Sequence, residues 1–204
     1  METEVKILSQ TLEIFKARGI KKVTMDEISS ELGMSKRTIY ELFRDRENLV
    51  YKTLEYGMLQ EQKDLMAIIS EASNVIEALY LIGKDGQMKR GRINVLFFED
   101  IRKYYMAFFD NSPRGKDIRN FEITFALLER GIREGIFLDD LNLEVVNSFI
   151  QEMMNLVHNL EIIPDFMERE RLIIHNIFLP YFRGISTQKG RELLEAYFTQ
   201  QNQD

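Results

Sequence analysis

The sequence predicts an all-α protein made of two domains, and three observations lead to this prediction. Apolar residues recur at spacings of three and four through nearly every segment, which is the period of an amphipathic helix. The three prolines and the clustered glycines fall mostly between such segments. With 204 residues and 45% hydrophobic content, the chain can fill a sizeable core. We expect a small N-terminal domain of three helices, residues 1–48, and a larger helical domain, residues 49–204.

The composition excludes several classes of protein. The chain contains no cysteine, which removes disulfides, thiolate nucleophiles and cysteine zinc sites. The N-terminus lacks the apolar core of a signal peptide, so we expect a cytoplasmic protein. The longest apolar runs, such as residues 93–101, are broken by polar residues and fall far short of the roughly 20 residues that span a bilayer. No membrane span is therefore expected.

The charge is unevenly distributed along the chain. The net charge is −6, yet residues 1–50 contain nine basic and nine acidic side chains. The whole acidic excess therefore lies beyond Val50, and a polyanion would have to bind the N-terminal part.

The first two helices are predicted by an apolar stripe and by capping signals. The stripe has helical spacing and ends at Gly19, which suits the left-handed position after a helix, so the first helix covers about residues 4–18. Its members are Val5, Leu8, Leu12 and Phe15, together with Ile14. Thr24 and Glu27 then fit a capping box, which starts a second helix over about residues 25–32.

A tight turn and a third helix follow. Gly33 and Met34 separate the second helix from Ser35, a plausible N-cap, and a link of about three residues is typical of a helix-turn-helix. On the third helix, one side gathers Ile39, Leu42 and Phe43, which we expect to anchor it in the core. The opposite side is polar and should face away from the core; it carries Arg37, Tyr40, Glu41 and Arg44, with Lys36 and Thr38 at its edges.

The rest of the chain is predicted to be a series of helices. Asp45 can cap a long fourth helix over about residues 46–72. Further helical segments are expected at about 74–84, 91–109, 116–134, 143–160, 165–183 and 187–200, with loops at 83–91 and 110–115. Pro180 should kink or end the helix that contains it, because proline has no amide hydrogen to donate.

The pattern "ILSQTLEIFKARGIKKVTMDEISSELGMSKRTIYELFRDRENLV", from Ile7 to Val50, resembles the N-terminal DNA-binding domain of TetR/AcrR-type transcriptional regulators. Two later segments, "LLERGIREGIF" from Leu127 and "FRGISTQKG" from Phe182, are more weakly similar to parts of the family's second domain. The resemblance implies a helix-turn-helix DNA-binding domain followed by a helical ligand-binding and dimerisation domain. It also implies a homodimer whose paired third helices enter successive major grooves of a palindromic operator.

The resemblance assigns roles to residues of the first domain. Lys36, Arg37 and Thr38 match the base-reading start of the recognition helix, where Arg or Lys can bind guanine O6 and N7 and a threonine methyl can meet that of thymine. Thr24, Tyr40 and Arg46 match positions that hold phosphates; Arg46 stands where lysine is commoner. The expected DNA-binding set is Thr24, Ser35, Lys36, Arg37, Thr38, Tyr40 and Arg46.

Glu41 is unexpected beside a phosphate surface. Its carboxylate could accept a hydrogen bond from a cytosine N4, or it could pair with Arg37 or Arg44.

The second domain is rich in aromatic residues and methionine. At helical spacing such residues usually form core, but the resemblance implies a cavity for a small apolar or aromatic effector. We expect its lining to include Tyr105, Phe121, Phe125, Met154 and His158. No metal site or cofactor is predicted, because the two histidines, His158 and His175, lack a metal-binding spacing.

Two helical segments carry more apolar residues than one core-facing stripe needs. Residues 143–160 and 165–183 are apolar around much of their circumference, which implies a second buried face. The resemblance points to a four-helix bundle formed by this pair from each subunit.

Three functional hypotheses follow. The first is a ligand-released homodimeric repressor that binds DNA in a sequence-specific way. The second is a DNA-binding dimer without a small-molecule effector, regulated by another protein or architectural. The third is an all-α enzyme, which we do not expect because the sequence lacks a recognisable nucleophile, metal set or phosphate loop.

Overall fold

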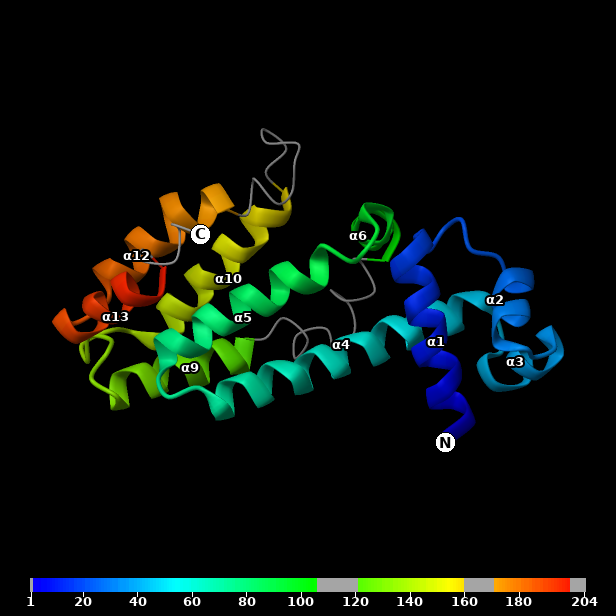
Figure 1. Ribbon diagram of the computed structural model, residues 1–204, viewed down its shortest axis with the longest axis horizontal. Helices are drawn as coiled ribbons and strands as arrows, with labels where there is room; N and C mark the ends of the chain where they lie inside the picture. The colour runs from blue at the N-terminus through cyan, green and yellow to red at the C-terminus, as the bar shows by residue number, and fades with distance from the viewer. Residues whose placement is uncertain (1, 106–120, 160–170, 199–204) are drawn as a thin grey trace. The chain divides into compact units, whose positions relative to one another are not determined.

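The computed structural model describes residues 2–105, 121–159 and 171–198 of the protein (Figure 1). The helices, with the labels of Figure 1, are α1 (Glu2–Arg18), α2 (Met25–Leu32), α3 (Lys36–Phe43), α4 (Arg46–Glu71), α5 (Val75–Arg90), α6 (Val95–Asp100), η1 (Ile101–Tyr105), α9 (Phe121–Arg133), α10 (Leu143–Asn159), η2 (Ile174–Phe178), α12 (Leu179–Gly184) and α13 (Gln188–Phe198). The predicted fold class, all-α with a helix-turn-helix domain before a larger helical domain, is confirmed.

The chain folds into two compact units, each with its own hydrophobic core. The described residues of the first unit are 2–64 and 88–105, and those of the second are 65–87, 121–159 and 171–198. The proposed domain boundary after residue 48 stays a prediction, since α4 runs unbroken across it from Arg46. In the part of the chain that the structure describes, no helix is long and apolar enough to cross a membrane.

Local hydrogen bonds set the ends of α2 and α3, as predicted. The Thr24 hydroxyl accepts from the amide of Glu27 at 3.3 Å, and the Glu27 carboxylate accepts from the amide of Thr24 at 2.7 Å. The hydrogen bond from the Thr24 backbone lowers the pKa of Glu27. Helix α2 ends at Gly33, whose φ of +61° is left-handed, and the Ser35 hydroxyl accepts from the amide of Thr38 to start α3.

The core of the first unit anchors α3 through two residues. Ile39 and Phe43 are fully buried, together with Phe15, Ile28 and Leu49 from the neighbouring helices. Our prediction that Leu42 also anchors the helix is wrong, because 42% of its surface is exposed. Positions 39 and 43 lie one turn apart and form the buried stripe of this eight-residue helix. At 100° per residue, position 42 lies at the edge of that stripe, so its side chain remains partly in solvent.

A strained turn joins α3 to α4. Arg44 has φ +60° and ψ −55°, and the amide of Asp45 donates to the carbonyl of Phe43 at 2.6 Å, which is a γ-turn of the rare positive-φ type. The Asp45 carboxylate then accepts from the amide of Asn48 at 2.8 Å. Asp45 therefore caps α4, as predicted.

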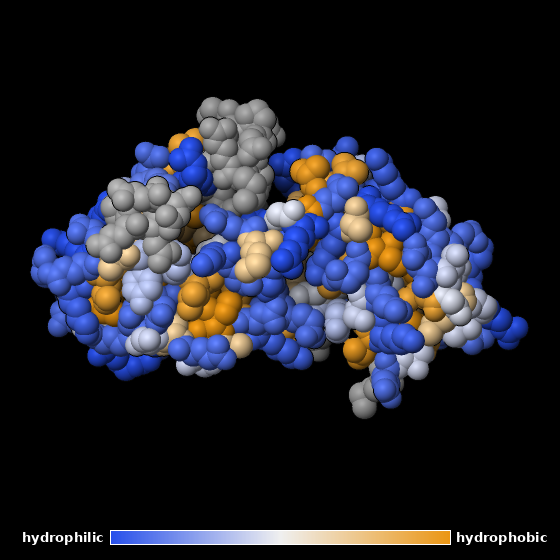
Figure 2. Space-filling model, in the orientation of Figure 1, coloured by the Kyte–Doolittle hydropathy of each residue, from blue (hydrophilic) through white to orange (hydrophobic). Residues whose placement is uncertain are grey.

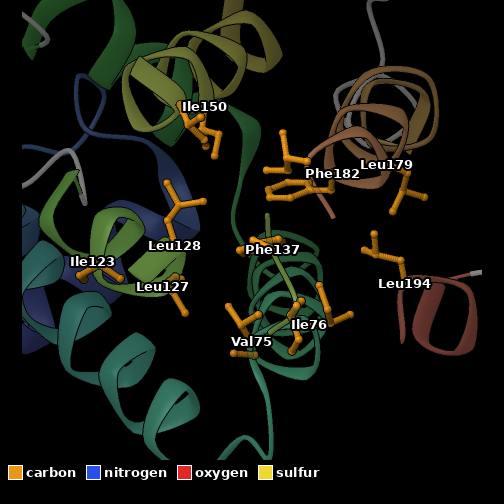
Figure 3. Packing of buried hydrophobic residues seen from close by; sticks show 14 of the residues in the cluster. Val75, Ile76, Ile123, Leu127, Leu128, Phe137, Ile150, Leu179, Phe182 and Leu194 are labelled. Carbon is orange, nitrogen blue, oxygen red and sulfur yellow. The ribbon is translucent and has the colours of Figure 1, made fainter. Parts of the chain in front are cut away.

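The second unit is built around Phe137, which follows α9. Figure 3 shows this ring among side chains from α5, α9, α12 and α13, and its centroid lies 6.1 Å from that of Phe182. The backbone of residues 136–138 pairs with residues 185–187: Leu138 donates to Ile185 at 3.0 Å and Thr187 donates to Ile136 at 2.9 Å. The two segments that resembled the family's second domain therefore lie side by side.

Two predicted boundaries are different in the structure. Our prediction of a loop at residues 83–91 is wrong, because α5 continues to Arg90. Lys89 holds the end of this helix against α4, since its ammonium pairs with Glu61 and Asp64 at 3.2 and 2.8 Å. The next helix begins at Val95 after an Asn94 cap, and not at residue 91. Residues 106–120, 160–170 and 199–204 lie outside the described part of the chain. The loop expected at 110–115 and the helix ends predicted in these ranges therefore stay predictions.

Pro180 does not end the helix that contains it, because α12 continues to Gly184, but a wider turn comes before the proline. Residues 174–178 are π-helical, and the amide of Leu179 donates to the carbonyl of Ile174, five residues earlier. The extra residue in this turn accommodates the proline, which has no amide of its own to donate, at the second position of α12.

Large apolar side chains are also exposed in both units. On the face drawn in Figure 2, hydrophobic residues emerge in separate patches among hydrophilic ones. The most exposed include Val95 on α6 and Val145 on α10, at 59% and 64%.

Two glycine substitutions test the packing around Phe137 and the continuation of α5 through residue 83. A Cβ at Gly131 would lie 2.1 Å from a ring carbon of Phe137, whereas a Cβ at Gly83 meets nothing within 4 Å. We expect Gly131→Ala to lower the free energy of unfolding by about 1–3 kcal/mol through overpacking. Gly83→Ala should raise it by about 0.5–1 kcal/mol, since alanine favours a helix. Urea unfolding followed by circular dichroism measures both, and a destabilising Gly83→Ala would contradict a helix at residue 83.

Candidate nucleic-acid interface

The polar side of α3 is exposed, as its helical pattern predicts. Lys36, Arg37, Thr38 and Tyr40 face solvent, whereas Ile39 between them is fully buried. Figure 1 shows α3 beside α2, and the short turn at Gly33 connects them. A capped helix with a buried anchor and an exposed polar side is the arrangement of a helix-turn-helix recognition helix.

Each basic side chain on this surface is paired with a carboxylate. Lys36 Nζ lies 2.8 Å from Asp26 Oδ1, and this hydrogen bond raises the pKa of Lys36. Arg37 Nε donates to Glu41 Oε1 at 2.9 Å, so Glu41 pairs with Arg37, one of the two arginines considered from the sequence. A third pair, 3.5 Å long, joins Arg44 and Asp45. Exposed pairs of this kind contribute about 0–1 kcal/mol, so DNA could replace them at low cost.

Thr24 and Ser35 act as caps within the protein. The Thr24 hydroxyl also donates to Glu27 Oε2 at 2.9 Å, and the Ser35 and Thr38 hydroxyls share a hydrogen bond of 2.9 Å. All three hydroxyls lie in exposed residues. Their contact with phosphate or bases stays a prediction.

Arg46 has a structural role that the sequence did not predict. Its Nη2 donates to the carbonyls of Ile20 and Val23, at 2.7 and 3.0 Å. The guanidinium therefore fastens the loop between α1 and α2 to the first residue of α4. The sequence did contain a signal for this role: arginine stands where lysine is commoner, and a guanidinium can donate to two carbonyls at once.

The same loop is held from its other side by α6. The Asp100 carboxylate accepts from the amides of Ile20 and Lys21, both at 2.7 Å. Asn94 contacts the end of α1, where its amide donates to the carbonyl of Lys16 at 2.8 Å and its side chain to that of Ala17 at 3.2 Å. Figure 1 shows α6 next to this end of α1.

Gly19 is required where α6 approaches. Its φ is +83°, and a Cβ there would lie 3.0 Å from Leu96 Cβ and 3.2 Å from the Asp100 carboxylate. Sequence reasoning found this glycine as a helix end but missed Asn94 and Asp100, because nothing in the local pattern connects them to residues about 80 positions earlier.

The residues predicted to line an effector pocket lie in different parts of the structure. Tyr105 is buried in the core of the first unit, with its ring edge-on to Tyr51 at 5.9 Å. In the second unit Phe125 is half-buried and Met154 is 48% exposed. The side chains of Phe121 and His158 lie outside the described part. The pocket therefore stays a prediction.

An open hollow of about 460 Å³ lies between α1, α2 and α4. Its lining includes the charged residues Glu13, Lys16 and Glu31, which do not suit the apolar effector expected from the sequence. Within the described residues, no three histidine or acidic side chains are grouped so that they could hold a metal ion.

A family model described as "Bacterial regulatory proteins, tetR family" matches residues 7–51, which cover α2, α3 and most of α1 and reach the start of α4. A comparison with curated protein sequences finds no match.

Solved structures similar to this chain are also regulators. A TetR-family transcriptional regulator from Pectobacterium atrosepticum is 19% identical, with 92% of this chain and 95% of that chain covered and a TM-score of 0.72. A transcriptional regulator from Cytophaga hutchinsonii is 17% identical, with coverages of 89% and 97% and a TM-score of 0.71. A proposed regulator from Saccharomonospora viridis, in complex with choline, is 15% identical, with coverages of 98% and 97% and a TM-score of 0.58.

These similarities show that the chain has the same fold as these solved structures. The match over residues 7–51 coincides with the capped helices and the exposed polar side of α3 described above. Residues 7–51 of this chain therefore form the N-terminal domain of the tetR family of bacterial regulatory proteins, which are DNA-binding transcriptional regulators.

Proposed function

We propose that the protein is a homodimeric repressor that binds a palindromic operator through α3 and is released from it by a small effector. The observation that carries this proposal is the exposed polar side of α3, presented by a turn and two caps in a domain of the tetR family. Arg37, at the start of α3, is suited to a guanine edge, and Thr38 to a thymine methyl. Thr24 and Tyr40 would contact phosphates on either side.

Dimerisation would give this small domain useful affinity. Its positive and negative charges are balanced, so one copy attracts DNA weakly, whereas two copies add their contacts on successive grooves. The second unit offers an apolar surface for the dimer: Phe149 on α10 is 48% exposed, and its ring lies 4.9 Å from that of Tyr181 on α12. Burial raises the pKa of Tyr181. We assign α10 and the η2–α12 segment to a four-helix bundle with the partner subunit.

Release requires an effector that binds one arrangement of the protein better than the other. The contacts of Asn94 and Asp100 with the end of α1 offer a route, since a displacement of α6 would remove hydrogen bonds from the loop that precedes α2. The structure of the Saccharomonospora regulator with choline supports a small organic effector for this fold. For this protein we expect an apolar or aromatic one.

Selection from a pool of random duplexes tests the function. We expect the wild-type protein to enrich a palindromic site, and Arg37→Ala to lose preference at one base pair of each half-site by about 1–3 kcal/mol. Arg133→Ala, an exposed change in the second unit, is the control and should retain the preference. If the wild-type protein enriches no sequence, the proposal is wrong. Screening compounds against the bound site then separates an effector-released repressor from a dimer without an effector.

Arg46→Met separates a structural role for this residue from a phosphate contact. We expect the first unit to lose about 1–3 kcal/mol of stability, because two carbonyls lose their donors. The thermal unfolding temperature without DNA should fall by several degrees. Arg44→Met is the control, since the Arg44 side chain is 90% exposed. A phosphate contact would be supported instead if the unfolding temperature of Arg46→Met is unchanged and the salt slope of DNA binding falls by about one.

Phe149→Glu tests the proposed dimer surface. A carboxylate buried there without a partner should weaken association by about 3 kcal/mol, or about 100-fold in Kd. Sedimentation equilibrium should then show a shift from dimer toward monomer at micromolar concentration. Met66→Glu, a similarly exposed methionine on α4, should leave the dimer intact. A monomeric wild-type protein would contradict the assignment.

A further inference from the structure

We infer that Glu41 determines sequence specificity, because it holds Arg37 for contact with a base and repels the phosphates that would otherwise attract that side chain. This inference rests on the proposed function and names a residue that controls it. Glu41 lies four residues after Arg37 on α3, and both side chains are exposed, at 62% and 88%.

The pair is not explained by the stability of α3. The first turn of this helix contains the cations Lys36 and Arg37 and no acidic residue, although the helix dipole favours acidic residues there. An arginine four residues before a glutamate is also the less favourable order for such a pair. The arrangement therefore points to a role outside the folding of the helix.

The geometry leaves the guanine-binding end of Arg37 available. Its Nε donates to Glu41 Oε1 at 2.9 Å, so the two Nη groups at the tip of the guanidinium remain to span O6 and N7 of a guanine. A side chain tethered at Nε loses less rotamer freedom when it binds a base than an untethered one.

The charge of Glu41 acts differently on specific and non-specific DNA. On non-specific DNA, Arg37 would bind mainly phosphates, and the neighbouring carboxylate opposes this contact. At a guanine edge, which carries no net charge, the pair can stay intact. The other cations of this surface, Lys36 and Arg44, are also paired with carboxylates, so discrimination depends on base contacts more than on net attraction.

Glu41→Gln tests the inference, because it removes the charge and keeps the shape. The affinity of the full-length protein is measured at three salt concentrations for two fluorescent duplexes of equal length. One duplex carries the selected site, and the other is scrambled. We expect the variant to bind the scrambled duplex about 3–10-fold more tightly, with a salt slope larger by about one, and the selected duplex nearly as before. The ratio of the two affinities should therefore fall at least 3-fold.

Asp45→Asn is the matched control, since it neutralises the carboxylate beside Arg44 and asparagine can still cap α4. It should change both affinities by the same factor. Single base changes in the site add a second readout: the preference that Glu41→Gln weakens must lie at the base pair that Arg37→Ala weakens.

Three outcomes would overturn the inference. The first is that Glu41→Gln changes both affinities equally, as the control does, which would leave Glu41 as a general charge. The second is that it weakens preference only at another base pair, which would make Glu41 a direct reader of cytosine. A wild-type protein without sequence preference would overturn the proposed function as well, whereas the first two outcomes leave that function standing.

Discussion

The loop between α1 and α2 is the part of the first unit on which the rest depends. Gly19, Ile20 and Val23 of this loop are buried, so polar backbone groups beside them need partners inside the protein. Asp100 of α6 accepts from two amides of this loop, and Arg46 of α4 donates to two of its carbonyls. Ile20, which takes part in both sets of contacts, also buries its side chain completely. The loop therefore joins three helices, and the position of α2, and with it α3, follows from these contacts.

The recognition surface combines a rigid support with weakly held charges. Ile39 and Phe43 are buried and the helix ends are capped, so the backbone of α3 is well supported. The ion pairs on its outer side are exposed and contribute little to the stability of the fold. On the binding mode proposed above, the side chains can meet DNA without a change in the helix that carries them. The pairing also leaves the proposed DNA-binding surface close to neutral in the free protein.

The second unit satisfies its backbone groups in a similar way. Arg130 donates to the carbonyls of Ile69 and Ala72 at the end of α4, at 2.6 and 2.7 Å, and pairs with Glu134. Glu134 in turn accepts from the amide of Val75 at the start of α5, at 2.8 Å. One arginine and one glutamate thus close the turn between two helices. Together with the backbone pairing of residues 136–138 and 185–187, they hold the segments that surround Phe137.

The features that the sequence by itself determined are those decided within a few residues. The capping box at Thr24, the left-handed Gly33, the Ser35 cap and the exposed side of α3 all depend on side chains at fixed short offsets, and the structure has each of them. Only the tertiary structure decided the partners of Asp100 and Arg46, which lie 80 and 26 residues from Ile20. It also decided that Leu42 is exposed and that α5 passes through Gly83, because burial and ion pairs with α4 override local preference. Short-range hydrogen bonds can be read from residue order, whereas a contact between distant segments exists only once the chain has packed.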